Sequence, residues 1–312
     1  MARRRLWRAA QFAAGVLLVG LAARSIIVNW QSLRAQPLEW RLSPQWIAAS
    51  VLVVFATYAV LIEAWRRVVL SMGEHLRFTT AARIWFVASL GKYLPGKVWA
   101  VAGAAVLARR AGVDPAVAVA GALMLQALAL GSGAVAVAIT APETFRAAGP
   151  EVAPFIILVL LLSLAGVAAL ASQNLLDRIN RLLPSSLPPL RAVRLDMLAL
   201  AFAGNLCAWV GYGAALLLLA RGVLPDVALS LPQSIGVFTC SYLIGFIALF
   251  APGGLGPRES VFLLILASDV GLKPAAGLAL ASRILLTGTE VLPAVPFLLR
   301  RETAPPSIRR PE

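Results

Sequence analysis

Charged residues, histidine and cysteine are scarce in this chain, and each shortage removes a class of function. Only 13% of the 312 residues are charged, against about a quarter in a soluble domain, which argues against a water-soluble protein. The single histidine, His75, excludes a histidine metal cluster, and two cysteines in apolar runs predict buried thiols rather than a disulfide framework. A Walker-type loop and a Ser/His/Asp set are also missing, so we expect a protein that is not an enzyme, with no catalytic residues, cofactor or metal.

Long apolar runs are what the chain has in abundance. Hydrophobic residues make up 60% of it, and the mean hydropathy is +0.84. A spanning helix needs roughly 20 mostly apolar residues. Six runs meet that length, at about 9–28, 46–66, 113–140, 152–171, 196–220 and 275–299. We therefore predict an all-α polytopic membrane protein, a single membrane domain over residues 1–312 with about six full transmembrane helices.

The basic residues indicate how the chain is oriented. A net charge of +14 could suggest nucleic acid, but Lys and Arg occupy short loops between apolar runs, so we expect no nucleic-acid partner. If the spans alternate and the interrupted stretches at about 84–107 and 233–269 each return to the side they came from, 18 basic residues lie on the side of both termini and six on the other side. This bias predicts a multi-pass protein of the cytoplasmic (inner) membrane with both termini in the cytoplasm, including the tail 301–312.

Two further apolar stretches, about 84–107 and 233–269, are interrupted by helix-breaking residues beside charges. Lipid cannot satisfy a freed backbone amide or an ion, so such segments need protein or water around them. We interpret both as re-entrant hairpins, while paired short crossings remain the alternative. The breaking residues are Pro95, Gly96, Pro252, Gly253, Gly254 and Gly256.

The two halves of the chain resemble each other. Gly112-Val113-Asp114-Pro115-Ala116 follows the first break and Gly271-Leu272-Lys273-Pro274-Ala275 follows the second. Each half reads as span, span, broken hairpin, span, and three full crossings invert the second half. We therefore predict an inverted repeat, with a first half-repeat at 1–145 and a second at 146–300, of the kind found in alternating-access carriers. The alternative is that Gly-x-x-Pro-Ala is only a common helix start.

Lys92, Tyr93 and Lys97 surround the first break and are candidates for substrate binding. Two ammonium groups beside freed backbone amides could clamp an anionic headgroup. The alternative is that both lysines extend to the cytoplasmic headgroups and only anchor the hairpin.

Four more charged residues lie in or after the second break. Arg258 is a candidate for binding phosphate bidentately while Glu259 orients it or contacts an amine, or the two form a structural pair. Arg283 and Glu290 stand two helical turns apart on one face of the last helix. Because each would be costly in lipid, we expect them to face the interior and reach the second hairpin.

These motifs support a family resemblance. Ser89-Leu90-Gly91-Lys92-Tyr93-Leu94-Pro95-Gly96-Lys97-Val98-Trp99 and Pro252-Gly253-Gly254-Leu255-Gly256-Pro257-Arg258-Glu259 resemble the two signature stretches of the lysylphosphatidylglycerol synthase membrane-domain, or flippase-like, family. The resemblance covers most of the chain and includes Arg283. It implies a multi-span helical fold with two re-entrant elements and movement of a lipid between leaflets. In the namesake proteins a fused soluble domain synthesises the lipid; since this chain stops at Glu312, we expect it not to aminoacylate a lipid itself.

The sequence thus predicts a lipid flippase or transporter. A (phospho)lipid headgroup would enter a charged cavity between the inverted halves, contacting Lys92, Tyr93, Lys97, Arg258, Glu259, Arg283 and Glu290. Its partners would be membrane lipids, with a phosphate-bearing headgroup, and a separate lipid-modifying enzyme; an oligomer is compatible with this interpretation. The alternative is a carrier for a small water-soluble anion.

Overall fold

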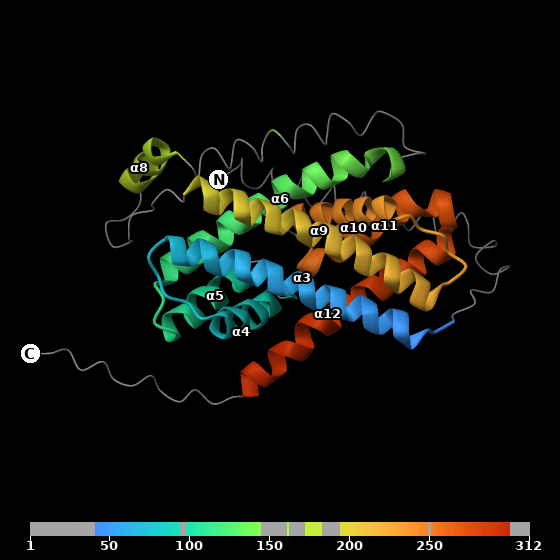
Figure 1. Ribbon diagram of the computed structural model, residues 1–312, viewed down its shortest axis with the longest axis horizontal. Coiled ribbons are helices and arrows are strands. Elements are labelled where there is room, and N and C mark those ends of the chain that lie inside the picture. Colours follow the sequence, from blue (N-terminus) through green and yellow to red (C-terminus); the bar gives the residue numbers. More distant parts are fainter. Residues whose placement is uncertain are drawn as a thin grey trace, which may run out of the picture.

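The computed structural model describes residues 41–93, 98–144, 161, 172–182, 194–248 and 251–299, and within them the regular elements are all helices, joined by short turns and loops (Figure 1). The prediction of an all-α protein is confirmed for these residues. In chain order the elements are α3 (Pro44–Ser71), α4 (Phe78–Ser89), the 3-10 helix η1 (Leu90–Tyr93), α5 (Val98–Arg110), α6 (Pro115–Thr144), α8 (Gln173–Leu182), α9 (Leu195–Val223), α10 (Leu231–Ile247), the 3-10 helix η3 (Pro252–Gly254), α11 (Pro257–Val270) and α12 (Leu272–Leu299).

Four of the helices are long and apolar enough to cross a membrane. They span Pro44–Ser71, Pro115–Thr140, Leu195–Val223 and Leu272–Leu299. These match four of the six predicted spans. The predicted span at 9–28 lies outside the described residues, and so does that at 152–171 apart from Leu161. The protein is therefore a multi-pass membrane protein.

Each interrupted stretch consists of two short helices joined by a break. In the first, α4 contacts α5, and in the second, α10 contacts α11. The helices have 12, 13, 17 and 14 residues, so each is about 18–26 Å long, shorter than the roughly 30 Å of a bilayer core. α4 begins at Phe78, ahead of the interrupted stretch predicted at about 84–107, and α11 begins at Pro257, directly after the second break.

Glycine shapes the second break. Gly253, Gly254 and Gly256 have φ of 56°, 71° and 87°, the left-handed region that other residues avoid. A methyl group added to Gly254 would also lie 3.0 Å from the backbone of Gly245 in α10. Pro95 and Gly96 of the first break lie outside the described residues.

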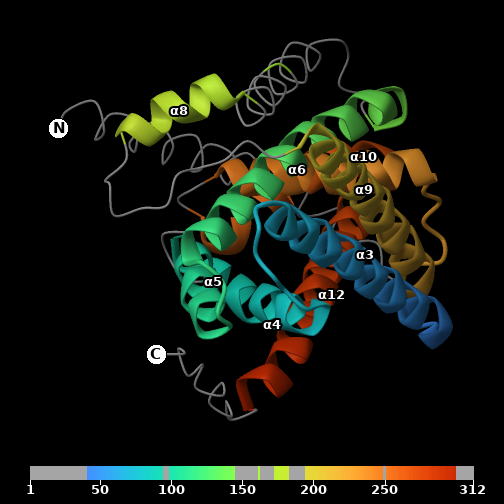
Figure 2. The ribbon, with the colours of Figure 1, turned by 60° about the vertical axis from the view of Figure 1, so that its left-hand side comes forward.

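α3 and α9 run antiparallel along a seam of small residues, side by side in both ribbon views (Figures 1 and 2). Three glycines of α9 face α3: Gly204 approaches Ala64, Gly211 approaches Thr57, and Gly222 approaches Ile47. The seam also contains a hydrogen bond of 2.7 Å from the Ser50 hydroxyl to the carbonyl of Ala215. Small residues let helices in lipid approach closely, and α3 and α9 therefore form a closely packed central pair of the domain.

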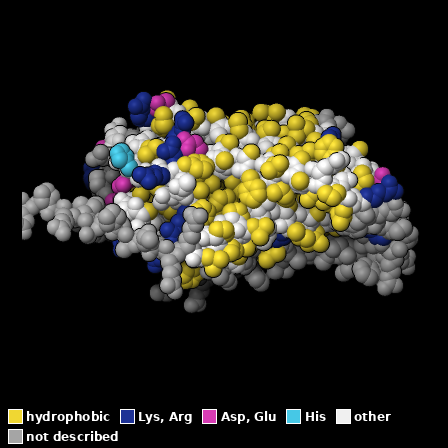
Figure 3. All heavy atoms as spheres, turned by 60° about the horizontal axis from the view of Figure 1, so that its bottom comes forward, with side chains coloured by type: hydrophobic (Ala, Val, Ile, Leu, Met, Phe, Trp, Pro, Cys, Tyr) yellow, Lys and Arg dark blue, Asp and Glu magenta, His cyan; other side chains and the backbone are white. Residues whose placement is uncertain are grey.

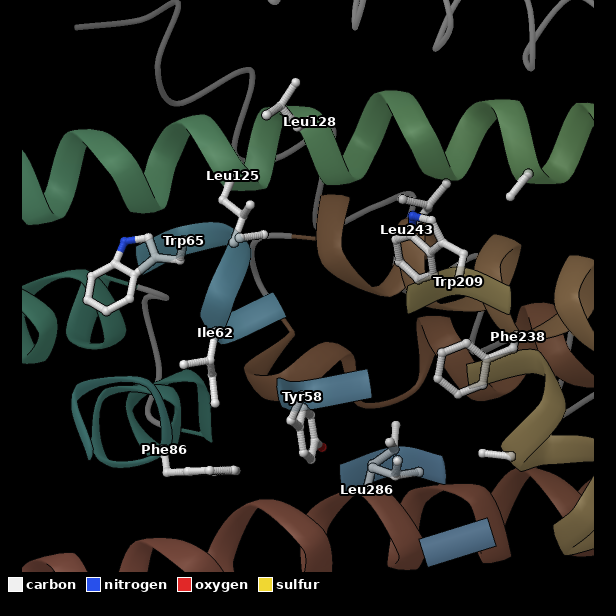
Figure 4. Close-up of a cluster of buried hydrophobic side chains, with 14 of the residues drawn as sticks. Tyr58, Ile62, Trp65, Phe86, Leu125, Leu128, Trp209, Phe238, Leu243 and Leu286 are labelled. Atoms are coloured by element: carbon white, nitrogen blue, oxygen red, sulfur yellow. The ribbon is translucent and has the colours of Figure 1, made fainter. Parts of the chain in front are cut away.

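Hydrophobic side chains form both the interior and the outer surface. Inside, aromatic and aliphatic residues from α3, α4, α6, α9, α10 and α12 pack together, including Tyr58, Trp209 and Phe238 (Figure 4). Outside, a broad hydrophobic band separates two ends where charged side chains gather (Figure 3). Such a surface suits a lipid environment. The prediction that both thiols are buried was wrong for Cys207, which is exposed on α9; Cys240 is partly buried, and both are free.

Candidate functional site: a charge cluster at the two breaks

The two broken segments meet each other beside α12. η1 contacts η3, and a methyl group on Gly253 would lie 3.4 Å from the Tyr93 ring. α12 contacts α4, α3, α9 and α11, so it passes between parts of the chain that are far apart in sequence. The charged residues that the sequence places at each break are therefore neighbours in space.

This meeting point lies at mid-depth along the spanning helices. Arg283 and Glu290 fall in the central third of the 28-residue α12, and Tyr58 falls in the central third of the 28-residue α3. A helix of that length is about 42 Å long, so these groups are more than 10 Å from either end. Charges at such a depth are costly unless other protein groups compensate them.

Glu290 is the acceptor at the centre of the first group of contacts. Lys92 forms an ion pair with its Oε1 at 2.5 Å, and the Tyr93 hydroxyl donates to its Oε2 at 2.8 Å. The Tyr58 hydroxyl donates to Oε1 at 3.3 Å. Glu290 therefore links α12 to α3 and to the first break. The expectation that it reaches the second hairpin was wrong.

Arg283 and Glu259 form the second group. Their side chains make a short ion pair, and Arg283 Nη2 donates to the carbonyl of Gly253 at 3.0 Å. The other oxygen of Glu259 accepts the backbone N–H of Gly256 at 2.9 Å, which closes the turn that starts α11. Arg283 thus reaches the second broken segment, as its position in the sequence indicated.

Arg258 stands apart from these pairs although it is only 8% exposed. Its Nη2 donates to the Ser282 hydroxyl at 2.9 Å, and its guanidinium lies 5.2 Å from the centre of the Phe238 ring. The described residues include no ion pair of Arg258. The sequence-based alternative of an Arg258–Glu259 structural pair is therefore wrong, because Glu259 pairs with Arg283 instead.

All four tyrosines of the chain gather at this cluster. Tyr58 and Tyr93 bind Glu290, the Tyr58 and Tyr212 rings are 6.2 Å apart, and Tyr212 and Tyr242 stack on Phe238 at 5.0 and 6.2 Å. Sequence reasoning missed Tyr58, Tyr212, Tyr242, Phe238 and Ser282. Their one visible signal was the rarity of tyrosine within otherwise apolar helices.

Two other charged positions remain, Lys97 and Glu63. Lys97 lies outside the described residues. Glu63 accepts from both Arg66 and Arg67 at 2.7 Å, which forms a local network within the last third of α3. Among the residues that the structure describes, no three His, Cys, Asp or Glu come together as a metal-binding group.

Fold and site together define a helical membrane protein whose two broken segments carry compensated charge into the middle of the domain. Residues 8–293 match the family described as "Lysylphosphatidylglycerol synthase TM region". The match covers most of the chain, so the protein belongs to this family. No curated protein matches the chain. The family is that of a membrane region associated with lipid, which agrees with the apolar surface of the domain.

Proposed function

We propose that this protein moves a phospholipid between the leaflets of the cytoplasmic membrane, in the manner of a flippase. The observation that carries the proposal is the charge cluster at mid-depth, where Lys92, Arg258 and Arg283 lie with Glu259 and Glu290. A lipid headgroup crossing the bilayer must pass that depth, where unassisted polar groups are strongly disfavoured. Charged side chains that can exchange one ion-pair partner for another can interact with the headgroup in place of its hydrating water molecules.

The arrangement of helices supports alternating access by two inverted half-repeats. α3 and α9, which hold the same place in the two halves, run antiparallel, as inversion requires. The contacts also come in matched pairs: α12 contacts α4 as α6 contacts α10, and α12 contacts α3 as α6 contacts α9. Gly112 and Gly271, which precede the last helix of each half, both have left-handed φ. Two re-entrant hairpins entering from opposite sides would meet tip to tip where η1 contacts η3.

In this mechanism the headgroup travels along the cluster while the acyl chains stay in lipid. Lys92 and Glu290 connect the first break to α12, whereas Arg283 and Glu259 connect the second break to it. When the protein opens toward one side of the membrane, one of these two ion pairs breaks. The other ion pair stays intact and keeps the opposite side closed. Both termini would be cytoplasmic, and the transport step itself would involve no covalent chemistry.

Transport by purified protein in vesicles tests the proposal. Fluorescent phospholipids in one leaflet should become accessible from the other faster than in protein-free vesicles. The double variant Lys92→Gln/Glu290→Gln removes one pair without leaving an unpaired charge and should slow transfer at least tenfold. Arg194→Gln, which alters an exposed ion pair (Arg194 side chain 76% exposed), is the matched control and should transfer at the wild-type rate.

Two results would overturn the proposal. One is wild-type protein, shown to be folded, that transfers no phospholipid but admits radiolabelled glycerol phosphate into the vesicles, which would establish a carrier for a soluble anion. The other is a folded double variant that transfers lipid at the wild-type rate.

A further inference from the structure

We infer that the headgroup carried by this site is net anionic, with no compensating amine. The inference rests on the proposed lipid transport and names its substrate class. It starts from the imbalance in the cluster: in the part of the chain that the structure describes, three cations, Lys92, Arg258 and Arg283, face two carboxylates, Glu259 and Glu290.

The two carboxylates are already compensated. Glu290 has Lys92 and two tyrosine hydroxyls, and Glu259 has Arg283 and a backbone N–H. An ammonium group on the substrate would have to compete with these cations for a carboxylate, and it would add positive charge where cations already outnumber carboxylates. Among the described residues of the cluster, each carboxylate thus has a cation of its own.

The excess positive charge resides on Arg258. It is more than nine-tenths buried, and its contacts are a neutral hydroxyl and an aromatic ring. Such contacts partly offset the cost of desolvating a guanidinium but provide no counter-charge. An arginine in this setting matches the oxygens of a phosphate, which it can bind through two parallel N–H bonds.

Two tyrosine hydroxyls near Arg258 lack a hydrogen-bond partner in the described part of the chain, and they too can donate a hydrogen bond. Tyr212 and Tyr242 stack on Phe238, the ring over which the Arg258 guanidinium lies. Within the described residues neither hydroxyl has a hydrogen-bond partner. A phosphate accepts from guanidinium and phenol alike, and a phosphodiester supplies one negative charge, which is the difference between cations and carboxylates among the described residues of the cluster.

Ligand-induced stabilisation of the detergent-purified, full-length protein tests this inference without transport. Dihexanoylphosphatidylglycerol, which is anionic, should raise the Tm by several degrees. Dihexanoylphosphatidylethanolamine, which is zwitterionic, and the cationic lysyl ester of the phosphatidylglycerol should raise it by less than one degree. The anionic response should disappear in Arg258→Gln and persist in part in Arg258→Lys and fully in Arg194→Gln.

The inference is overturned if the zwitterionic or cationic lipid stabilises as much as the anionic one, if no ligand shifts the Tm, or if Arg258→Gln keeps the full response. Because the ranking of lipids is measured on wild-type protein, it stands even where a variant does not fold. Glycerol phosphate, a water-soluble anion without acyl chains, is tested in the same assay. If it stabilises as strongly as the anionic lipid, and no lipid is transferred in vesicles, the anion selectivity holds while the proposed lipid transport fails.

Discussion

The ion pair between Lys92 and Glu290 should be a large source of stability, because it connects the first break to α12 at mid-depth. Removing one partner of a buried pair costs about 3–5 kcal/mol. Glu290 is 9% exposed and Lys92 30% exposed, so solvent reduces that cost unequally. We expect Lys92→Gln, which leaves the buried carboxylate with only its phenol donors, to lower the free energy of unfolding by about 3 kcal/mol.

The other two variants complete a thermodynamic cycle. Glu290→Gln leaves the more exposed Lys92, so its loss should be about 2 kcal/mol. The double variant leaves no unpaired charge and should lose about 3 kcal/mol, which gives a coupling energy of about 2 kcal/mol between the two side chains. Titration with SDS in mixed micelles, followed by circular dichroism, measures each free energy of unfolding.

The exposed pair Arg194–Asp196 provides the comparison, since its side chains are 76% and 49% exposed. Its cycle should show no measurable coupling. A Lys92–Glu290 coupling as small as that of the exposed pair would refute the reasoning, because it would mean that water reaches the cluster freely.

Three further predictions concern the same region, each measured by the same titration. Gly254→Ala forces an alanine into φ of 71° and against the backbone of α10, so it should cost about 2 kcal/mol, whereas Gly288→Ala, with nothing within 4 Å, should be neutral or slightly stabilising. Tyr58→Phe removes a hydroxyl bonded to Glu290 and should cost about 1 kcal/mol, while Tyr242→Phe should leave stability unchanged; equal effects would contradict the assignment. Arg283→Gln removes the ion pair with Glu259 and the hydrogen bond to the carbonyl of Gly253, so it should lower the free energy of unfolding. A decrease below about 1 kcal/mol would contradict the inference that Arg283 holds the second break against α12.

Run length and helix breakers made the main elements predictable. An apolar run of about 20 residues has few alternatives to a spanning helix, which is why α3, α6, α9 and α12 were identified from sequence. Glycine located the second break for an equally local reason, since Gly253, Gly254 and Gly256 all have left-handed φ; Pro95 and Gly96 of the first break lie outside the described residues.

The ion-pair and hydrogen-bond partners of the polar side chains were less predictable, because they depend on which segments lie next to each other in three dimensions. Glu290 lies on the same helix as Arg283, and nothing in their spacing assigns the two to different breaks. Tyr58 resembles an ordinary packing aromatic until its hydroxyl is seen to bind Glu290. Ser282 adjoins Arg283 in sequence but binds Arg258, a contact that depends on how α11 lies against α12.

The position of Arg283 and Glu290 in α12 bears on how the protein is made. A helix with two charges near its centre inserts poorly by itself, since each costs about 2.5–3.5 kcal/mol at mid-bilayer. Lys92, on η1, and Glu259, on α11, both precede α12 in the chain and so are synthesised first. Their side chains can receive Arg283 and Glu290 as α12 leaves the ribosome. The last helix would thus enter the bilayer as part of an assembling domain, and its insertion would report whether both breaks had already formed.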